Sequence, residues 1–255
     1  MKEVPEYKLI FEKPKTGNYA LVIPVINEGK RIQSLLSKIQ NLNLKNLDIV
    51  LVDGGSIDGS LDNVKDSIVN TLILKLGKGK LGSQLRCAYD FCLQRQYKGV
   101  VTIDGNDKDD PVAIPKFIEK LKQGYDFVQA SRFISGGEEI NTPLSRKLAI
   151  KFIHAPLLSL SSGFHWTDTT QGFRGYSVSL LESEKIGIFR NCFENYELLF
   201  YISHEAPRQG FKCIEIPTRR VYPIGKVPTK ITSFSGNFSV MKTLLKVVLG
   251  CYNTK

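Results

Sequence analysis

Five short apolar segments alternate with amphipathic stretches along the first half of the chain. Each is rich in β-branched and aliphatic residues, which is typical of strands that are buried on both faces of a sheet. The segments are YALVIPV (19–25), LDIVLVD (47–53), NTLILKL (70–76), GVVTID (99–104) and YDFVQAS (125–131). We predict a strand for each of them.

Helical patterns lie between these strands. One helix is predicted over residues 82–96. Another is predicted earlier in the chain, directly after Asn27. The apolar residues that share one side of the helix after Asn27 are Ile32, Leu35, Leu36, Ile39 and Leu42. Strands that alternate with helices predict an α/β fold with a Rossmann-like, mostly parallel sheet and helices on both of its faces.

The chain has 255 residues, of which 42% are hydrophobic, and this is enough to bury the core of a single domain. Glycine, proline and arginine become more frequent from about residue 132, and we find no linker long enough to separate two domains. We divide the chain into an N-terminal extension (1–18), a ligand-binding half (19–131), an irregular C-terminal elaboration (132–232) and an amphipathic helix (233–255).

Acidic residues gather where the fourth predicted strand ends. The stretch VVTIDGNDKDDP (100–111) carries Asp104, Asp107, Asp109 and Asp110. Ligands of such sheets bind at the carboxyl ends of the strands, where the segments NE (27–28) and DGGSIDGS (53–60) are also expected. The cluster therefore indicates a metal site, although an acidic loop without a metal is an alternative. We predict that Asp109 and Asp110 are surface acids near a helix start, where the helix dipole favours negative charge.

The net charge of +10 is compatible with nucleic acid, an anionic membrane or a phosphorylated substrate. The basic residues are dispersed and do not interleave with aromatic ones, so we predict no nucleic-acid binding. The five cysteines show no metal-ligand or disulfide spacing, which predicts reduced thiols and a cytoplasmic location. The charged N-terminus predicts no signal peptide, and no apolar run approaches the ~20 residues of a membrane span.

A glycine motif offers a different function. Gly77, Gly79 and Gly82 have the Gly-x-Gly-x-x-Gly spacing of dinucleotide-binding loops, with Asp104 at the distance of a ribose-binding acid. The motif follows the third predicted strand rather than the first, however, and Asp104 belongs to an acidic cluster. A turn or a lysine-bearing phosphate loop is therefore favoured over a dehydrogenase, and the motif lacks the Lys-Ser/Thr pair of a P-loop.

Taken together, seven segments resemble family 2 glycosyltransferases of the GT-A fold, most closely the dolichyl- or polyprenyl-phosphate sugar synthase branch. The resemblance spans residues 19–230 and follows the order of the family's motifs. The segments are VIPVINE, VLVDGGSIDGS, GKLGSQLR, VTIDGNDKDDPVAIP, ASRFISGG, DTTQGFRGYS and IEIPTRRVYPIGKVPTK.

This resemblance implies an inverting enzyme that moves a hexosyl group from a UDP-, GDP- or dTDP-sugar to polyprenyl phosphate or a lipid-linked glycan. It implies a Mg²⁺ or Mn²⁺ cofactor and peripheral contact with the cytoplasmic face of a membrane. The alternatives are a transferase that acts on a glycan hydroxyl and a non-catalytic nucleotide-sugar-binding protein. The oligomeric state stays open.

The resemblance also assigns metal and donor residues. Asp104 matches the first acid of the family's Asp-x-Asp element, and registering on Pro111 places Asn106 at the second, with Asp107 as the alternative ligand. Helix capping is the alternative role for Asn27. The residues assigned to the donor nucleotide and its phosphates are Pro24, Asn27, Glu28, Asp53, Lys80, Asp104, Lys226 and Lys230.

On the acceptor side the resemblance selects Arg132, Arg146, Asp168 and Arg174. Guanidinium groups can grip phosphate oxygens with two hydrogen bonds. Asp168 is the expected general base if the acceptor is a hydroxyl, and an orienting partner of Arg174 or another basic group if it is a phosphate. The predicted catalytic set is Asp104, Asp168, Arg132 and Arg146.

The C-terminal helix has an apolar side flanked by Lys242 and Lys246. Such a helix can lie on an anionic membrane or pack against the protein's own core, and the sequence supports both alternatives equally. The residues on the apolar side are Phe238, Met241, Leu244, Leu245 and Val248.

Overall fold

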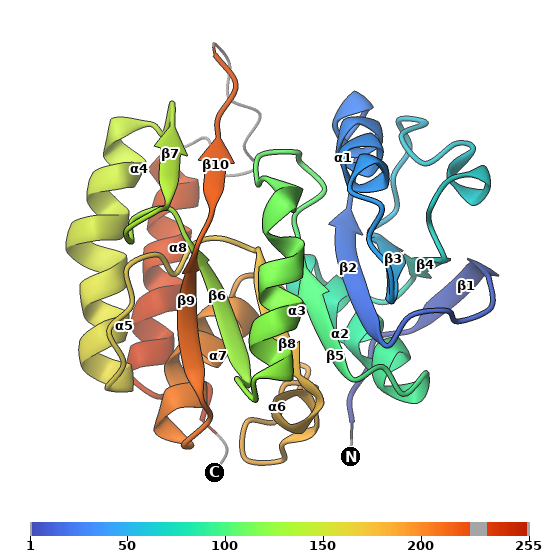
Figure 1. Cartoon of the computed structure of the whole chain (residues 1–255). Helices are drawn as coiled ribbons and strands as arrows, with labels where there is room; N and C mark the ends of the chain where they lie inside the picture. The colour runs from blue at the N-terminus through green and yellow to red at the C-terminus, as the bar shows by residue number, and fades with distance from the viewer. Residues whose placement is uncertain (1, 225–233, 254–255) are drawn as a thin grey trace.

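A computed structural model describes residues 2–224 and 234–253 of the chain (Figure 1). An eight-stranded sheet runs through the molecule, and only its strands β1 and β8 run antiparallel to their neighbours. Its strand order is β1 (Tyr7–Glu12), β4 (Thr71–Lys75), β3 (Leu47–Asp53), β2 (Tyr19–Val25), β5 (Gly99–Thr102), β8 (Arg174–Ser177), β6 (Phe127–Ser131) and β9 (Cys213–Pro217).

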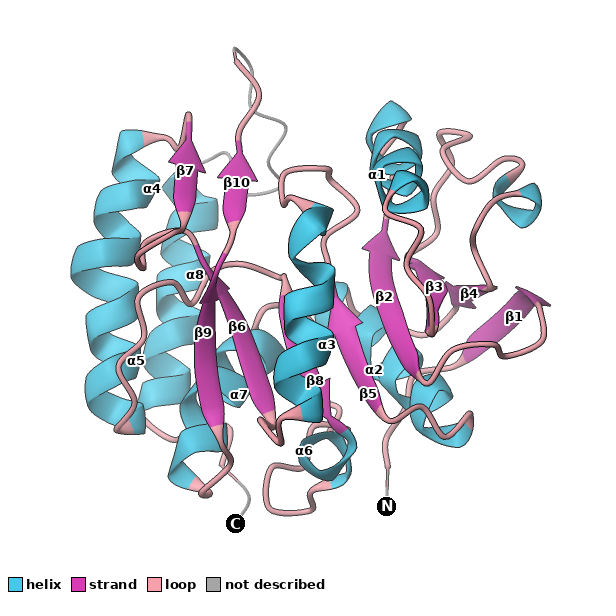
Figure 2. Ribbon diagram, viewed as in Figure 1, coloured by secondary structure: helices cyan, strands magenta, loops and turns pink. Residues whose placement is uncertain are grey.

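Helices cover both faces of this sheet, as Figures 1 and 2 show. One face carries α1 (Lys30–Asn41) and α3 (Ile114–Lys122). The other carries α2 (Leu81–Gln94), α5 (Ala155–Ser162), α6 (Val178–Glu182), α7 (Glu197–Arg208) and α8 (Phe234–Val248). The remaining elements are α4 (Leu144–Ala149), the π-helical turn η3 (Ile150–His154), the short 3₁₀ turns η1 (Val64–Asp66) and η2 (Pro111–Ala113), and a parallel pair of strands, β7 (Glu138–Ile140) and β10 (Arg219–Val221).

Two hydrophobic clusters explain the continuous apolar strands. Successive side chains of a strand point to opposite faces, so Ala20 and Val22 pack beneath α2 while Leu21 and Ile23 pack against α1 and α3. All four are fully buried. The predicted α/β fold, with a mostly parallel sheet in a single domain, is confirmed.

The N-terminal extension contributes a strand that the sequence did not predict. Strand β1 pairs antiparallel with β4, from Tyr7 opposite Lys75 to Glu12 opposite Thr71. Leu9 and Ile10 remain 37% and 48% exposed on this edge strand. The segment therefore lacks the buried apolar run by which the inner strands could be found.

The C-terminal helix packs on the protein's own core. Leu244 and Val247 are fully buried in the cluster that includes α5 and α7, whereas Leu245 is 43% exposed. The side chain of Phe238 lies outside the described residues. Core packing is thus confirmed for α8, and Leu244 is not available to a membrane. Within residues 2–224 and 234–253, we find no helix long and apolar enough to cross a bilayer.

Candidate active site

Several loops meet at the carboxyl edge of the sheet, beyond which β7, β10 and the start of α4 extend (Figure 2). Strand β10 holds the acidic loop in place through two backbone hydrogen bonds. Asp110 N donates to Arg219 O (3.0 Å), and Val221 N donates to Lys108 O (2.8 Å). This register brings the side chains of β10 against the acids of the loop.

The acidic loop turns its aspartates in different directions. Asn106 Nδ2 lies 3.4 Å from Asp104 Oδ2, so these two side chains face the same place. Asp107 has a left-handed backbone (φ 56°) and turns toward α1, where it accepts hydrogen bonds from Ser34 Oγ (2.7 Å) and Lys38 Nζ (2.8 Å). The alternative that placed Asp107 as the second metal ligand is therefore wrong.

The other two aspartates differ from each other. Asp110 accepts a hydrogen bond from Val112 N (3.1 Å) at the start of η2, which confirms its predicted place. Asp109 is 2% exposed and forms an ion pair with Arg220, so the prediction of a surface acid was wrong for it. The β-bridge between Asp109 and Arg220 is the reason, because it buries this acid against β10. Burial raises the pKa of the Asp109 carboxyl despite the guanidinium.

Two buried cations accompany Asp104. Arg220 Nη2 lies 3.7 Å from Asp104 Oδ2, and Lys108 Nζ lies 5.1 Å from the ring centre of Tyr222. Lys108 and Arg220 are each 5% exposed. Burial and the nearby Arg220 lower the pKa of the Lys108 ammonium, as expected where like charges are crowded. An anion bound here would relieve that crowding.

Segment 168–173 approaches Asp104 from the other side. Strand β8 runs antiparallel beside β5, with Arg174 opposite Thr102, and this pairing carries the segment to the carboxyl edge. A Cβ atom on Gly172 would lie 2.2 Å from Asp104 Oδ1. Glycine is therefore required at residue 172 for Asp104 to keep its position.

Asp168 and Arg132 form a fully buried ion pair. Arg132 Nε donates to Asp168 Oδ2 at 2.6 Å, and Gln171 Nε2 and Thr170 Oγ1 donate to the same carboxylate at 2.6 and 3.1 Å. Burial would raise the pKa of Asp168, but Arg132 and these hydrogen bonds outweigh it and hold the pKa below its usual value. Asp168 is thus ionised, and its ionic partner is Arg132 rather than Arg174.

A tyrosine joins two of the three predicted acceptor-side arginines. Tyr222 Oη lies 3.1 Å from Arg146 Nη1 and 3.4 Å from Arg132 Nη1. Burial would raise the pKa of Tyr222, but Arg220, Arg132 and Arg146 together lower it to about 7. The arginines around this hydroxyl thus stabilise negative charge strongly.

Arg174 has a different place from the one predicted. It is fully buried and donates to the backbone carbonyls of Gln171 (2.9 Å), Leu199 (2.7 Å) and Thr169 (2.9 Å). These bonds tie segment 168–173 to α7. Because the guanidinium is enclosed by the protein's own backbone, the expected contact between Arg174 and an acceptor does not fit the structure.

The predicted nucleoside residues shape the loops after β2 and β3. The Asp53 carboxylate accepts from Ser56 N (2.9 Å) and Ser56 Oγ (2.7 Å), which closes the loop after β3. Asn27 Oδ1 accepts from Ile57 N (2.9 Å) and joins the two loops. The N-cap of α1 is Gly29, which makes no side-chain cap, so the capping role for Asn27 was wrong.

The other donor-side predictions have varied environments. Pro24 is a buried residue of β2, and Glu28 is 7% exposed and paired with Arg31 at 2.8 Å. Neither presents a large accessible surface to a ligand. Lys226 and Lys230 lie outside the described residues.

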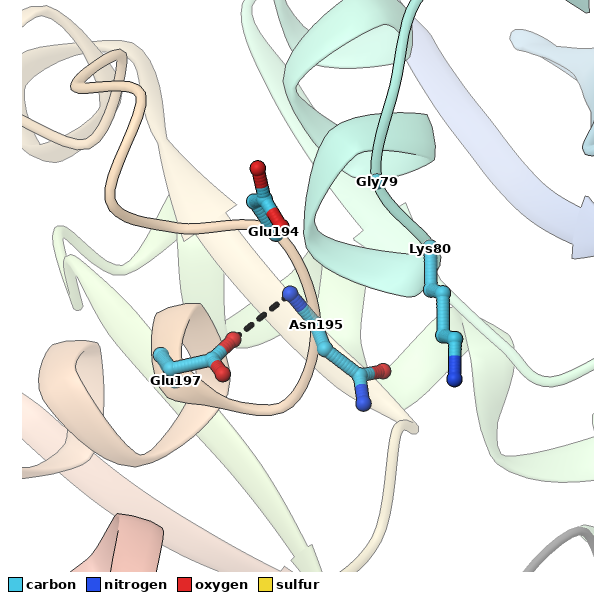
Figure 3. A pocket seen from close by; sticks show the side chains of 5 residues that line it. All are labelled: Gly79, Lys80, Glu194, Asn195 and Glu197. Carbon is cyan, nitrogen blue, oxygen red and sulfur yellow. Dashed lines mark hydrogen bonds between the residues drawn. The ribbon is translucent and has the colours of Figure 1, made fainter.

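Lys80 lies at an open pocket beside the start of α2 (Figure 3). The volume of this pocket is about 410 Å³, and its lining residues are Gly79, Lys80, Glu194, Asn195 and Glu197. Glu197 Oε2 accepts from Asn195 N at 2.6 Å, which fixes one of the two carboxylates. The glycine motif serves packing here, because a Cβ atom on Gly82 would lie 2.7 Å from the carbonyl oxygens of Phe193 and Asn195.

The sequence of this chain matches a known family profile. The profile of glycosyl transferase family 2 covers residues 20–184, which is more than half of the chain. The chain belongs to glycosyl transferase family 2.

Its relatives within the family extend the match. The chain is 30% identical to an uncharacterized protein of Methanocaldococcus jannaschii, over 79% of this chain and 81% of that protein. It is 29% identical to the dolichyl-phosphate hexose transferase of Haloferax volcanii, over 90% of this chain and 93% of that protein. Glucosyl-3-phosphoglycerate synthase of Mycobacterium tuberculosis, solved with Mn²⁺, UDP and glucosyl-3-phosphoglycerate, superposes with a TM-score of 0.61. That likeness covers 94% of this chain and 81% of the other at 15% identity, and it shows the GT-A fold.

The Mn²⁺ of that glycosyltransferase raises the question whether this chain's residues fit a divalent cation. Mg²⁺ and Mn²⁺ favour oxygen ligands, with carboxylates supplying the charge. In the acidic loop Asp104 faces the site, whereas Asn106 offers an uncharged amide. In the part of the chain that the structure describes, no three His, Cys, Asp or Glu residues gather as a metal site. Asp104 and Asn106 alone are therefore too few ligands to hold a divalent cation in the nucleotide-free protein.

Three residues of this family 2 glycosyltransferase site escaped the sequence analysis. Arg220 and Tyr222 are two residues apart on an extended segment, so their side chains point the same way, and this spacing could have indicated them. Gln84 Nε2 donates to Val25 O and Val52 O, both at 2.9 Å, and so bridges the ends of β2 and β3. A glutamine in a helix gives no such signal.

Proposed function

We propose that this family 2 glycosyltransferase is an inverting enzyme that moves a hexosyl group from a UDP-, GDP- or dTDP-sugar to polyprenyl phosphate, at the cytoplasmic face of a membrane. The observation that carries the choice of acceptor is the state of Asp168. This carboxylate is fully buried and accepts hydrogen bonds from Arg132, Thr170 and Gln171.

A hydroxyl acceptor needs a general base within about 3 Å of its proton, and such a base contributes about 10²-fold to 10⁴-fold to the rate. A buried carboxylate that is paired with arginine and has a lowered pKa is a poor base. A phosphate acceptor is already ionised at neutral pH and attacks without losing a proton. The environment of Asp168 therefore supports a phosphate acceptor.

An arginine cluster, formed by Arg132 and Arg146, can bind the phosphate of such an acceptor. Arg146 and Arg132 converge on Tyr222 Oη, an oxygen whose surroundings favour negative charge. Guanidinium groups form short, charge-assisted hydrogen bonds to phosphate oxygens. We place the acceptor phosphate beside Arg146, which is less buried than Arg132, and the name of the Haloferax volcanii relative supports a lipid-phosphate acceptor.

The reaction is then a single in-line displacement at the anomeric carbon. An acceptor phosphate oxygen forms the new bond to this carbon while the bond to the donor diphosphate breaks, and the electron pair leaves with the nucleoside diphosphate. The family supplies the prediction of inversion. The Mn²⁺ of the solved neighbour supports the predicted need for Mg²⁺ or Mn²⁺, whereas the ligand set of this chain argues against it.

Transfer to a glycan hydroxyl is the second candidate, and the pocket in Figure 3 favours it. Glu194 and Glu197 line this pocket, and Glu194 is exposed. A carboxylate that meets solvent can act as the general base that Asp168 cannot be. This candidate predicts that Glu194→Gln slows transfer, which the phosphate acceptor does not.

The apolar surface of α4 and η3 supports contact with a membrane. Leu144, Leu148 and Phe152 follow one another at four-residue spacing and are 68%, 45% and 72% exposed. Lys151 is exposed beside them, which complements the negative charge of anionic lipids. Arg146 lies on the same short helix as Leu144 and Leu148, so lipid docked here would bring its phosphate to the arginine cluster.

Phe152→Glu is expected to reduce co-sedimentation of the protein with anionic vesicles by about tenfold or more, because burial of a phenylalanine is worth about 1.5–3 kcal/mol. Leu245→Glu on α8 is the matched control and should leave co-sedimentation unchanged. Equal losses in both variants, or a loss in Leu245→Glu alone, would indicate that α8, and not the surface of α4 and η3, contacts the membrane.

The acceptor is tested directly with labelled sugar donors. Purified protein is incubated in detergent with UDP-, GDP- or dTDP-hexose and either polyprenyl phosphate or a soluble oligosaccharide. We expect label in the lipid product with one class of donor and none in the oligosaccharide. Label in the oligosaccharide alone would favour the second candidate, and no transfer to either acceptor would overturn the proposal.

A further inference from the structure

Two cations lie beside Asp104, where the Asp-x-Asp loop of the family is expected to hold its metal. Lys108 belongs to the acidic loop itself, four residues after Asp104. Arg220 comes from β10 and reaches to 3.7 Å from Asp104 Oδ2. Both side chains are almost fully buried, so their positions are set by the packing of the loop against β10.

Asp104 and Asp109 equal Lys108 and Arg220 in number, but Arg146, which meets the same Tyr222 over whose ring Lys108 lies, leaves the cluster positively charged. Asp109 pairs with Arg220, and Asp107 is directed away to Lys38. Asn106, at the second position of the Asp-x-Asp element, contributes no charge. A divalent cation bound to Asp104 would thus add two charges to a cluster in which Lys108, Arg146 and Arg220 already exceed the two carboxylates, which is an unfavourable arrangement.

The same arrangement is favourable for a diphosphate. A nucleoside diphosphate leaves as a multiply charged anion, and an enzyme must stabilise the charge that develops on it. Ammonium and guanidinium groups that are fixed by packing before the donor binds can do this by charge-assisted hydrogen bonds. They need no reorganisation when the bond breaks.

We propose that Lys108 and Arg220 neutralise the donor diphosphate in place of a divalent cation, so that transfer proceeds without metal. The proposal rests on the proposed function in one respect, which is that the donor is a nucleoside-diphosphate sugar. When the bond from the anomeric carbon to the phosphate oxygen breaks, the electron pair stays on that oxygen, and the two cations face it. The acceptor phosphate supplies the new bond, and no proton or electron is left over.

The first test uses the unmodified protein and the chelator EDTA. We expect that binding of UDP, GDP or dTDP, measured by calorimetry, and the rate of sugar transfer are nearly the same in excess EDTA and in millimolar Mn²⁺. We also expect no saturable Mn²⁺ binding to the nucleotide-free protein, followed by the paramagnetic resonance of free Mn²⁺. Loss of both nucleotide binding and transfer in EDTA, with recovery in Mn²⁺, would overturn the proposal.

The second test is Lys108→Gln, which removes the charge and adds an amide oxygen that can ligate a metal. We expect nucleotide binding in EDTA to weaken by about tenfold or more, the worth of one charge-assisted hydrogen bond, and Mn²⁺ to restore part of it. Lys38→Gln is the matched control, because Lys38 lies on α1 and pairs with Asp107. This variant should bind the nucleotide as the wild type does. Unchanged nucleotide binding in Lys108→Gln would show that Lys108 only packs on Tyr222, and would overturn its role.

These measurements separate the inference from the proposed function. If no labelled sugar reaches polyprenyl phosphate under any condition, the proposed acceptor fails, while nucleotide binding in EDTA and the Mn²⁺ titration still decide the role of the two cations. If Lys108→Gln does not fold, the measurements on the unmodified protein decide it alone.

Discussion

Replacing Asp104 with alanine is expected to reduce sugar transfer by about 10²-fold to 10³-fold, because it releases Arg220 and the loss of one preorganised donor to a developing anion usually costs that much. Asp104 faces Asn106, lies 3.7 Å from Arg220 and is contacted by segment 168–173. Its loss would leave Arg220 with Asp109 as its remaining acidic partner and would shift the guanidinium away from the donor. Initial rates at saturating donor and acceptor measure the effect.

Two further variants test whether the loss of transfer depends on the position of the Asp104 carboxylate. Gly172→Ala should reproduce much of the loss, because the added Cβ atom would lie 2.2 Å from Asp104 Oδ1 and must displace the carboxylate. Asp107→Asn should transfer sugar at nearly the wild-type rate, because Asp107 is directed toward Ser34 and Lys38. A fully active Asp104→Ala protein, or an inactive Asp107→Asn protein that is folded, would contradict the arrangement of the loop described above.

The second large effect is expected at the buried pair of Arg132 and Asp168. Removing one partner of such a pair leaves an uncompensated buried charge, and this costs about 3–5 kcal/mol of the free energy of unfolding. Asp168→Leu should therefore destabilise the protein strongly, as measured by urea denaturation. The double variant Arg132→Met/Asp168→Leu should recover most of that stability, because both charges are then absent.

Activity separates the structural part of this pair from its role at the acceptor. We expect the double variant to bind the nucleoside diphosphate normally but to have a strongly raised KM for polyprenyl phosphate, since Arg132 then no longer supports Arg146 and Tyr222. Near-normal use of polyprenyl phosphate by the stable double variant would show that the pair stabilises the fold and has no role at the acceptor. A fall in turnover alone, with an unchanged KM, would instead favour the general-base role.

The pKa of Asp168 adds a pH dependence with a definite sign. Its folded-state pKa lies below the ordinary value of 3.8, so the unfolded chain binds a proton more readily. The resulting stabilisation is present above pH 4 and is lost as the pH falls through the folded-state pKa. The double variant should therefore show a shallower loss of stability in acid than the wild type.

The sequence predicted the parts of this fold that are set by local patterns. Strands β2 and β3 were found with their observed bounds because they are buried on both faces and have continuous apolar runs. Strand β1 was not found, because an exposed edge strand such as the one from Tyr7 to Glu12 carries a mixed pattern. Whether a strand could be predicted therefore depended on its position in the sheet rather than on its length.

The candidate site was predictable where a motif marks it. Asp104, Arg132 and Asp168 were selected from motifs, and the structure brings them to one edge of the sheet. The direction of Asp107 depends on Lys38, which is 69 residues away in the sequence, and on a left-handed backbone at one residue. Arg220 entered the site only through the register of β10 against the acidic loop. The direction of Asp107 has no local signal, and the spacing of Arg220 and Tyr222 indicates only that these two side chains share a face, not which loop they meet.

The most direct test of the central claim is the chemical structure of the product that the purified protein makes from matched polyprenyl phosphate and polyprenol of the same chain length. We predict a sugar linked through its anomeric carbon to the lipid phosphate, with the anomeric configuration inverted relative to the donor, and no product from polyprenol. Product analysis by mass spectrometry and by anomeric proton couplings decides both points. A sugar attached to polyprenol itself, or retained configuration on polyprenyl phosphate, would contradict the account.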